Sequence, residues 1–273
     1  MSPSMADKTT NTFLLYCTLS WRMTTMNILS AMEYRVTFFL QVIGMFINDI
    51  ALILIWVIFF AQFPMINGWT LQDSILLMSM VTFIFGIVHV FSGGSRELAK
   101  TITQGELDYY LTYPKNVLWH VSISRTDISA LGDMLFGLVL FCFSGNISLE
   151  KIFLFLTISL FVAFILFNFL TITQSLSFFF GNFEDAAEAL YQSMMGFSLY
   201  PQTSFYGFLK VIMMTVLPAF FIVTIPVNII KTFDLLSFLL LLGFALVTFL
   251  LAVLVFYKGL QKYESGNLIN LKM

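Results

Sequence analysis

The chain of 273 residues is 59% hydrophobic and only 10% charged, and its mean hydropathy is +0.92. Soluble domains carry about 25% charged residues because their surface faces water, so a soluble globule and a disordered linker are both excluded. The formal net charge of −2 gives no reason to expect nucleic acid as a partner. We therefore expect an integral membrane protein.

The first segment, residues 1–35, lacks the basic start, compact apolar run and small-residue cleavage site of a signal peptide. In residues 12–34, large apolar side chains alternate with polar ones. Thr18, Arg22 and Thr25 fall on one helical face. This pattern predicts a helix that lies along the cytoplasmic membrane surface. A frayed leader is the alternative.

Seven runs are long and apolar enough to be candidate membrane spans, since a helix needs about 20 mostly apolar residues to cross. They are 36–61, 74–95, 128–144, 152–183, 189–209, 211–230 and 235–257. Seven crossings would put the two ends on opposite sides. However, basic residues flank both the first and the last run, and such flanks belong in the cytoplasm. The number of crossings is therefore expected to be even.

The run that does not cross is expected to be 211–230, because it contains Pro218 and Pro226. Each proline removes a backbone donor and clashes with the preceding turn, which favours two short half-helices that enter and return. The sequence thus predicts one all-α membrane domain, with six spans in 36–257, a re-entrant segment at 207–231 and a cytoplasmic tail at 258–273. Ten of the 13 lysines and arginines then lie on the cytoplasmic side: Lys8, Arg22, Arg35, Arg96, Lys100, Lys115, Arg125, Lys258, Lys262 and Lys272.

Several polar residues lie within the predicted spans. An aspartate at the centre of a span costs about 2.5–3.5 kcal/mol on insertion, so Asp49 should face other helices or a cavity rather than lipid. The same reasoning applies to the remaining members of the set, which either line a substrate route or form interhelical hydrogen bonds. For Asn168, Thr171 and Ser175, spaced along one face, hydrogen bonding is favoured. The full set is Gln41, Asn48, Asp49, Asp133, Asn168, Thr171 and Ser175.

The segment 96–127 is the longest predicted cytoplasmic stretch between spans, and it is rich in charge. Within it, Gly105 predicts a break and Pro114 predicts the end of a short helix. Glu106 and Asp108 suit the positive end of that helix, and Leu107, Tyr110 and Leu111 are expected on one face. Such a helix either rests on the membrane or serves as a handle for a cytosolic partner.

Motifs for chemistry are absent from the sequence. It contains no phosphate-binding loop, no H-E-x-x-H and no G-x-S-x-G. His89 and His120 have no partners at metal-ligand spacing, and Cys17 and Cys142 form no metal or redox pattern. We therefore expect no catalytic, cofactor-binding or metal residue in this chain.

Five stretches resemble the permease subunits of type-2 ABC exporters, in particular a bacterial subfamily of permeases usually paired with a second, different permease. They are GELDYYLTYP (105–114), ALGDMLFGL (130–138), LYPQTSFYGFLK (199–210), VLPAFFIVTIPVNII (216–230) and GLQKYES (259–265). The resemblance extends over most of the chain, from Glu33 to Glu264. These motifs are specific in combination and weak singly.

The resemblance implies six spans, an N-terminal interfacial helix, a cytoplasmic coupling helix between spans two and three, and an outer re-entrant hairpin before span six. It places Gly105, Glu106, Leu107, Asp108, Leu111 and Pro114 in the coupling region, and Pro218 and Pro226 in the hairpin. It further implies two cytosolic ATPase subunits that bind ATP and Mg, a second six-span permease that is more often a different chain than a copy, and a place in the bacterial cell membrane. One departure is that relatives commonly carry more arginines scattered through the coupling stretch, whereas this chain has Gln104, Tyr109 and Thr112 in that neighbourhood, which favours docking through aromatic and acidic contacts.

Two other functions are consistent with the composition. An ion-coupled secondary transporter could use Asp49 or Asp133 as its ion site, although no internal repeat suggests the symmetry common in such carriers. An intramembrane enzyme would need a catalytic pair near one interface, and the spacings suggest none. The transported substrate is not predicted.

Overall fold

The computed structural model describes residues 5–264 except 146, 202 and 204, with side chains from Leu14 onward. Ser265 of the last motif and Lys272 of the charge pattern lie outside the described residues. These residues form helices and no strand, and an isolated bridge between Ile66 and Trp69 closes one interhelical turn. The all-α membrane architecture is confirmed.

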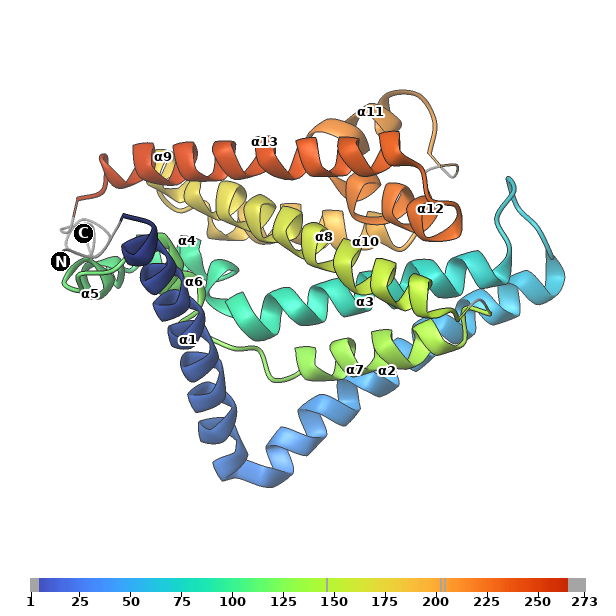
Figure 1. Ribbon diagram of the computed structural model, residues 1–273, viewed down its shortest axis with the longest axis horizontal. Helices are drawn as coiled ribbons and strands as arrows, with labels where there is room; N and C mark the ends of the chain where they lie inside the picture. The colour runs from blue at the N-terminus through green and yellow to red at the C-terminus, as the bar shows by residue number, and fades with distance from the viewer. Residues whose placement is uncertain (1–4, 146, 202, 204, 265–273) are drawn as a thin grey trace.

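Seven helices make up most of the molecule, and short helices connect them (Figure 1). The long helices are α1 (Met5–Ala31), α2 (Arg35–Gln62), α3 (Leu71–Ser92), α7 (Ala130–Cys142), α8 (Leu149–Ser175), α10 (Glu184–Ser198) and α13 (Leu235–Leu260). The short ones are η1 (Met32–Tyr34), η2 (Gly93–Ser95), α4 (Leu98–Thr103), α5 (Leu107–Leu111), α6 (Val117–Ser122), α9 (Ser177–Phe180), α11 (Gly207–Thr215), η4 (Phe220–Thr224) and α12 (Ile225–Lys231).

By length and composition, four stretches of the described chain can cross a membrane, or five if the bent pair α11–α12 is one span. The four are Leu14–Gln62, Leu71–Thr103, Leu149–Phe180 and Leu235–Leu260. The other two predicted spans are shorter, because α7 has 13 residues and α10 has 15. In Figure 1, α7 lies alongside the middle of α3.

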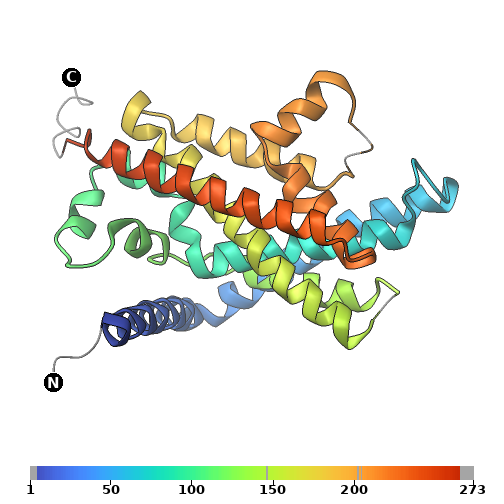
Figure 2. The same cartoon turned by 45° about the horizontal axis from the view of Figure 1, so that its top comes forward.

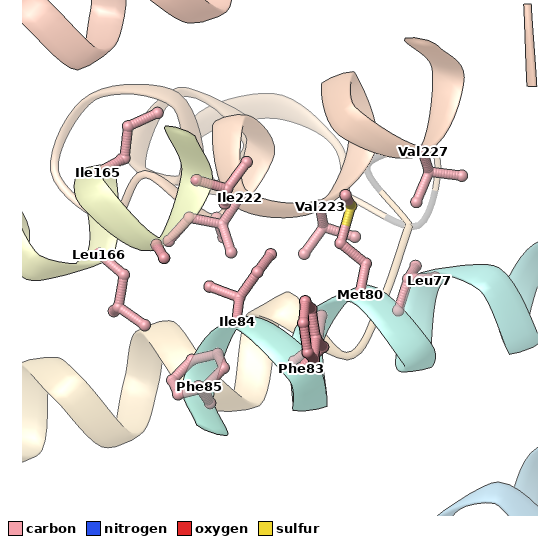
Figure 3. Packing of buried hydrophobic residues seen from close by; sticks show 14 of the residues in the cluster. Leu77, Met80, Phe83, Ile84, Phe85, Ile165, Leu166, Ile222, Val223 and Val227 are labelled. Carbon is pink, nitrogen blue, oxygen red and sulfur yellow. The ribbon is translucent and has the colours of Figure 1, made fainter. Parts of the chain in front are cut away.

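Helix α3 lies at the centre of the packing, against α7 on one side and α8 on the other. Two glycines permit the close approach to α7, since a Cβ at Gly86 would lie 2.6 Å from the Met134 backbone nitrogen and one at Gly137 would lie 2.6 Å from that of Phe83. On the other side, Met80 and Ile84 of α3 meet Leu166 of α8 and side chains of η4 (Figure 3). The helices therefore share one apolar core.

The segment that was expected to re-enter is a bent pair, with an angle of 72° between α11 and the η4–α12 helix. Pro218 lies in the break, as predicted. Pro226 differs from the prediction, because it occupies the first turn of α12 after the π-helical η4. Proline is tolerated there, since the first-turn N–H has no intrahelical acceptor. Only one of the two prolines breaks the helix.

Both ends of this pair contact the corner between α2 and α3. Before α11, the Thr203 carbonyl and the Tyr206 hydroxyl each accept a hydrogen bond of 3.3 Å from the Asn67 side chain. At the end of α12, Lys231 Nζ lies 2.6 Å from Asp73 Oδ1. These contacts favour a hairpin that returns to the end where it began.

The described ends of the chain lie together. Figures 1 and 2 show the start of α1 and the end of α13 near α5 and α6, while the α2–α3 corner and the α11–α12 hairpin lie at the other extreme. We refer to these as the α5 end and the hairpin end. This arrangement agrees with an even number of crossings.

Candidate functional site

The segment 96–127 folds into a compact unit at the α5 end. Gly105 adopts a positive φ of 74°, which lets the chain turn sharply between α4 and α5. Leu107 is fully buried, and Tyr110 is buried beside it. The small core that holds them consists of Leu98, Ile102, Leu107, Tyr110, Leu118, Val121 and Phe256. Leu111 differs from the expectation of a shared face, because it is 44% exposed.

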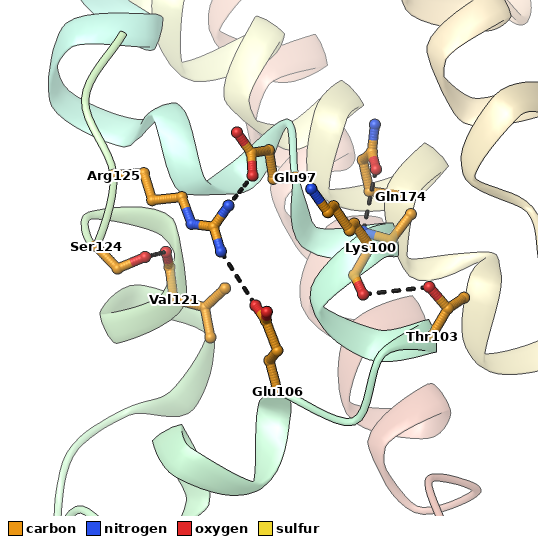
Figure 4. Close-up of polar contacts among 9 residues, drawn as sticks. Glu97, Lys100, Thr103, Glu106, Val121, Ser124, Arg125 and Gln174 are labelled. Atoms are coloured by element: carbon orange, nitrogen blue, oxygen red, sulfur yellow. Dashed lines mark hydrogen bonds and ion pairs between the residues drawn. The ribbon is translucent and has the colours of Figure 1, made fainter. Parts of the chain in front are cut away.

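Arg125 ties three parts of this unit together (Figure 4). Its guanidinium pairs with Glu97 after η2 and, at 3.0 Å, with Glu106 before α5. Gln174 of α8 accepts a hydrogen bond of 3.1 Å from the Ala99 backbone. Glu106 therefore holds the segment in shape and is less available to a partner than the sequence suggested.

The same unit is bonded to the first and last long helices. The Asn116 backbone donates to the Tyr16 hydroxyl of α1 at 3.1 Å, and its side chain donates to the Tyr257 hydroxyl of α13 at 2.8 Å. Trp119 Nε1 donates to Ser20 Oγ of α1 at 3.1 Å. Past α13, burial and the neighbouring Asp108 carboxylate raise the pKa of Tyr263 to about 12. A displacement of α5 and α6 would thus move α1 and α13.

His120 is buried in this unit between two tyrosine rings. Its ring centroid lies 5.2 Å from that of Tyr110 and 5.1 Å from that of Tyr113, and both ring pairs are edge-to-face. Burial first, and the charge of Lys115 second, lower the pKa of His120 below its ordinary value of 6.5. The imidazole is therefore neutral in the folded unit at pH 7.

This burial predicts an acid-sensitive fold for the 107–122 region. Because the folded pKa of His120 lies below the unfolded value of 6.5, its contribution to stability is complete above pH 6.5 and declines as the pH falls from there towards the folded pKa. Hydrogen exchange in α5 and α6, corrected for its intrinsic pH dependence, should accelerate over that window. His120→Phe keeps a ring between the tyrosines and should abolish the effect; an unchanged pH dependence in this variant would contradict the assignment.

A cavity of about 740 Å³ opens beside this unit, between the α1–α2 junction, the ends of α3 and α4, and α10. Gln41, one of the candidate pathway residues, lines it. Arg96 holds one wall by donating to Glu188 at 2.6 and 3.2 Å, and it lies 4.7 Å over the Tyr191 ring. His89 Nε2 and the Tyr191 hydroxyl are 2.6 Å apart. The segment 96–127 is thus joined to α10 by an ion pair, a contact that the sequence did not indicate.

Asp49 and Asp133 meet across the α2–α7 contact. They are 2% and 6% exposed, and their carboxyl groups lie next to each other. Gly132 allows this approach, since a Cβ there would lie 2.5 Å from the Val42 carbonyl oxygen. Two buried carboxyl groups thus lie at the α2–α7 contact, and neither is among the residues that line the cavity.

Among the other polar residues of the predicted spans, those of α8 are buried and the one beside Asp49 is exposed. Asn168 is buried and donates to Thr248 of α13 at 3.2 Å, which agrees with interhelical hydrogen bonding. Thr171 donates to a carbonyl of its own helix, and Ser175 is buried with no hydrogen-bond partner among the described residues. Asn48, which was expected to face other helices or a cavity, meets no other helix in the described part of this chain and is exposed on α2. Its neighbour Asp49 takes the inward position because successive helical residues point about 100° apart.

The hairpin is held at its exit by a charged contact. Asp73 receives hydrogen bonds of 2.9 Å from the Thr70 backbone and hydroxyl, which caps α3, and its other oxygen binds Lys231. The Lys231 ammonium also lies 5.8 Å from the centre of the Trp69 ring. This group of side chains fixes the end of α12 against the start of α3.

Removal of the Lys231 charge is expected to loosen the hairpin. Lys231→Met should destabilise the α12 contact by about 1 kcal/mol, because the ion pair is partly exposed, and hydrogen exchange in 220–231 should accelerate accordingly. Lys210→Met is the matched control, since Lys210 is exposed and has no ion pair among the described residues. Equal exchange in the two variants would show that the contact does not hold the hairpin.

Comparison with known proteins assigns the family. The model of the ABC-2 family transporter protein matches residues 46–266, which is most of the chain. The chain belongs to this ABC-2 transporter family. Neither a comparison with curated proteins nor one with solved structures gives a match. The protein is thus a multi-pass membrane component of an ABC transporter, a class that works with ATPase partners, and is not itself the ATPase.

Proposed function

We propose that this ABC-2 family protein is the permease subunit of an ATP-driven exporter in the bacterial cell membrane. In this proposal it is a single membrane domain with six crossings, by α2, α3, α7, α8, α10 and α13, and its described ends lie in the cytoplasm. Two separate cytosolic ATPase subunits bind ATP and Mg and act on the 96–127 segment. The substrate pathway forms with a second six-span permease, more often a different chain than a copy.

The exposed face of the α5 region carries the coupling assignment. Tyr109 is 59% exposed and Leu111 44% exposed, at an end of the molecule where apolar side chains would otherwise face water. On the opposite side of α5, Leu107 and Tyr110 are buried and pack in the small core. A partner that binds this face would move α1 and α13 through the hydrogen bonds of Asn116. The segment has both a docking surface and a rigid connection to the spans.

The exposed face of α2 supports the proposal that a second permease packs against this chain. Gln41, Gly44, Asn48 and Ala51 follow each other at intervals of three and four residues, and all are exposed. Amide side chains are unsuited to lipid, and small residues with amides are typical of helix–helix contacts in membranes. The polar stripe is therefore better explained by a neighbouring helix of another subunit than by lipid.

The test of the coupling assignment is Leu111→Asp, with Met65→Asp as the control. Leu111 is 44% exposed and Met65 is 64% exposed, so neither substitution alters the core. Met65 differs in position, because it lies at the hairpin end. We expect Leu111→Asp to lose co-purification with the ATPase and stimulated ATP hydrolysis, whereas Met65→Asp retains both. Retention of both properties in Leu111→Asp would reject the α5 region as the docking site.

The second candidate is an ion-coupled secondary transporter, which the buried pair of Asp49 and Asp133 favours. These two buried carboxyl groups lie next to each other between two helices, an arrangement expected of a protonation site in a carrier. Transport by the purified chain alone in vesicles, driven by a proton gradient without ATP and lost in Asp133→Asn, would support it. No transport under those conditions favours the ATP-driven permease.

A further inference from the structure

The cavity at the α5 end has the size and position of a ligand site. Its volume of about 740 Å³ lies within the range of small-molecule sites, about 300–1,000 Å³. It lies next to the segment proposed to receive the ATPase, and Gln41 on its wall begins the polar stripe of α2. A molecule bound here would contact both the coupling unit and the proposed subunit interface.

The ionisable groups of the wall are unequal in number. Carboxylates outnumber basic side chains by two, since the wall contains Arg96, Lys100 and Arg125 against Glu97, Asp127, Glu184, Asp185 and Glu188. Both arginines are already held by carboxylates, through Glu188 and Glu97. Asp127, Glu184 and Asp185 have no ion-pair partner in the described part of the chain. The unneutralised charge on the wall is therefore mainly negative.

The same wall contains two aromatic rings and a histidine with a buried nitrogen that is unpartnered in the described chain. Tyr34 and Phe38, at the α1–α2 junction, face the cavity, and rings of this kind attract cations over their faces. His89 lines the cavity and is only 4% exposed, yet its Nδ1 has no hydrogen-bond partner among the described residues. An unpartnered buried nitrogen is unfavourable unless a ligand or water meets it.

We infer that this cavity binds an organic cation with apolar or aromatic groups, and that such cations are the cargo class of the transporter. The carboxylates attract the charge, Tyr34 and Phe38 contact the apolar groups, and His89 Nδ1 accepts or donates a hydrogen bond where the cargo provides a polar group. This inference rests on the proposed transport function for its biological meaning, whereas the binding itself requires only this chain.

The test compares two ions of equal shape and opposite charge. Tetraphenylphosphonium and tetraphenylborate would be titrated into the purified full chain in lipid nanodiscs, with empty nanodiscs to subtract partition into lipid. We expect saturable binding of the phosphonium alone. The triple variant Asp127→Asn, Glu184→Gln, Asp185→Asn should bind it at least about tenfold more weakly, since each removed charge lowers the attraction. Glu150→Gln, at the start of α8 and outside the cavity wall, should bind as the unchanged protein does.

Three results would overturn the inference: equal binding of both ions, saturable binding of the borate alone, or phosphonium binding that the triple variant leaves unchanged. A triple variant that does not fold is replaced by Asp185→Asn alone, for which about a twofold to threefold loss is expected because Asp185 is exposed. None of these measurements involves the ATPase. Failure here is thus separable from failure of the Leu111→Asp experiment, which tests the proposed function.

Discussion

Gly94→Ala is expected to reduce ATP-driven transport at least about tenfold. A Cβ at this position would overlap the Val121 carbonyl oxygen and would lie 3.0 Å from the Ser122 carbonyl oxygen. Both atoms belong to the backbone of α6, so no side-chain rotation relieves the clash. Overpacking of this kind costs about 1–3 kcal/mol and occasionally more, and each 1.4 kcal/mol corresponds to a factor of ten. The expected consequence is that α6 separates from the end of α3.

The position of Gly94 explains why this change should affect coupling rather than insertion. Gly94 lies in η2, directly after α3, and α6 carries Trp119, which bonds to α1. A shift of α6 would therefore loosen the connection between the docking segment and the spans while the long apolar helices keep their membrane-spanning character. Expression in the membrane should persist as stimulated transport falls.

Gly196→Ala is the matched control, because it makes the same chemical change and is expected to leave transport unchanged. Gly196 lies within α10, and a Cβ there would have no neighbour within 4 Å. Replacement of a helical glycine by alanine in open space should be neutral or stabilising by up to about 1 kcal/mol. Hydrogen exchange in 93–122 and ATP-driven transport distinguish the two variants. Normal transport in Gly94→Ala would show that the contact between η2 and α6 is not needed for coupling.

The helices could be predicted from the sequence because their signals are local. Apolar runs predicted α2, α3 and α13 within a few residues, and the run 152–183 covered most of α8 together with α9, since each is a long stretch with few charges bounded by polar turns. The break at Gly105 and the stop before Pro114 also appeared where backbone chemistry requires them. The bend in 207–231 followed from Pro218. In each case a property of one segment determined the result.

The sequence did not reveal features that depend on contacts between distant segments. The orientation of α2 is one example, since Asp49 is buried against α7 while Asn48 beside it is exposed. The pairing of Arg96 with Glu188 joins residues 92 positions apart, and no spacing rule indicates it. Leu111 was grouped with Leu107 by helical spacing, but a helix of five residues is too short to define a stable apolar face.

The stripe on α2 leads to the second large expected effect, which concerns assembly. Gly44→Leu should leave the fold of the subunit unchanged, because a Cβ at Gly44 would have nothing within 4 Å. In the proposed assembly, however, a helix of the second permease packs on this face, and small residues there set the distance of approach. A leucine would force the two helices apart and weaken association at least about tenfold, which equals 1.4 kcal/mol, within the usual cost of overpacking.

Gly243→Leu is the matched control, since Gly243 is an exposed glycine in α13 that also has open space around its Cβ position. Thermal unfolding of the isolated subunit should be similar for both variants, and the fraction that co-purifies with the second permease, or self-associates, should fall only for Gly44→Leu. Asn48→Leu should also lower the fraction that co-purifies. The amide of Asn48 can then no longer form a hydrogen bond across the interface, and a leucine is more compatible with lipid. Full association of both α2 variants would mean that this face meets lipid, and the partner would then have to be sought on another helix.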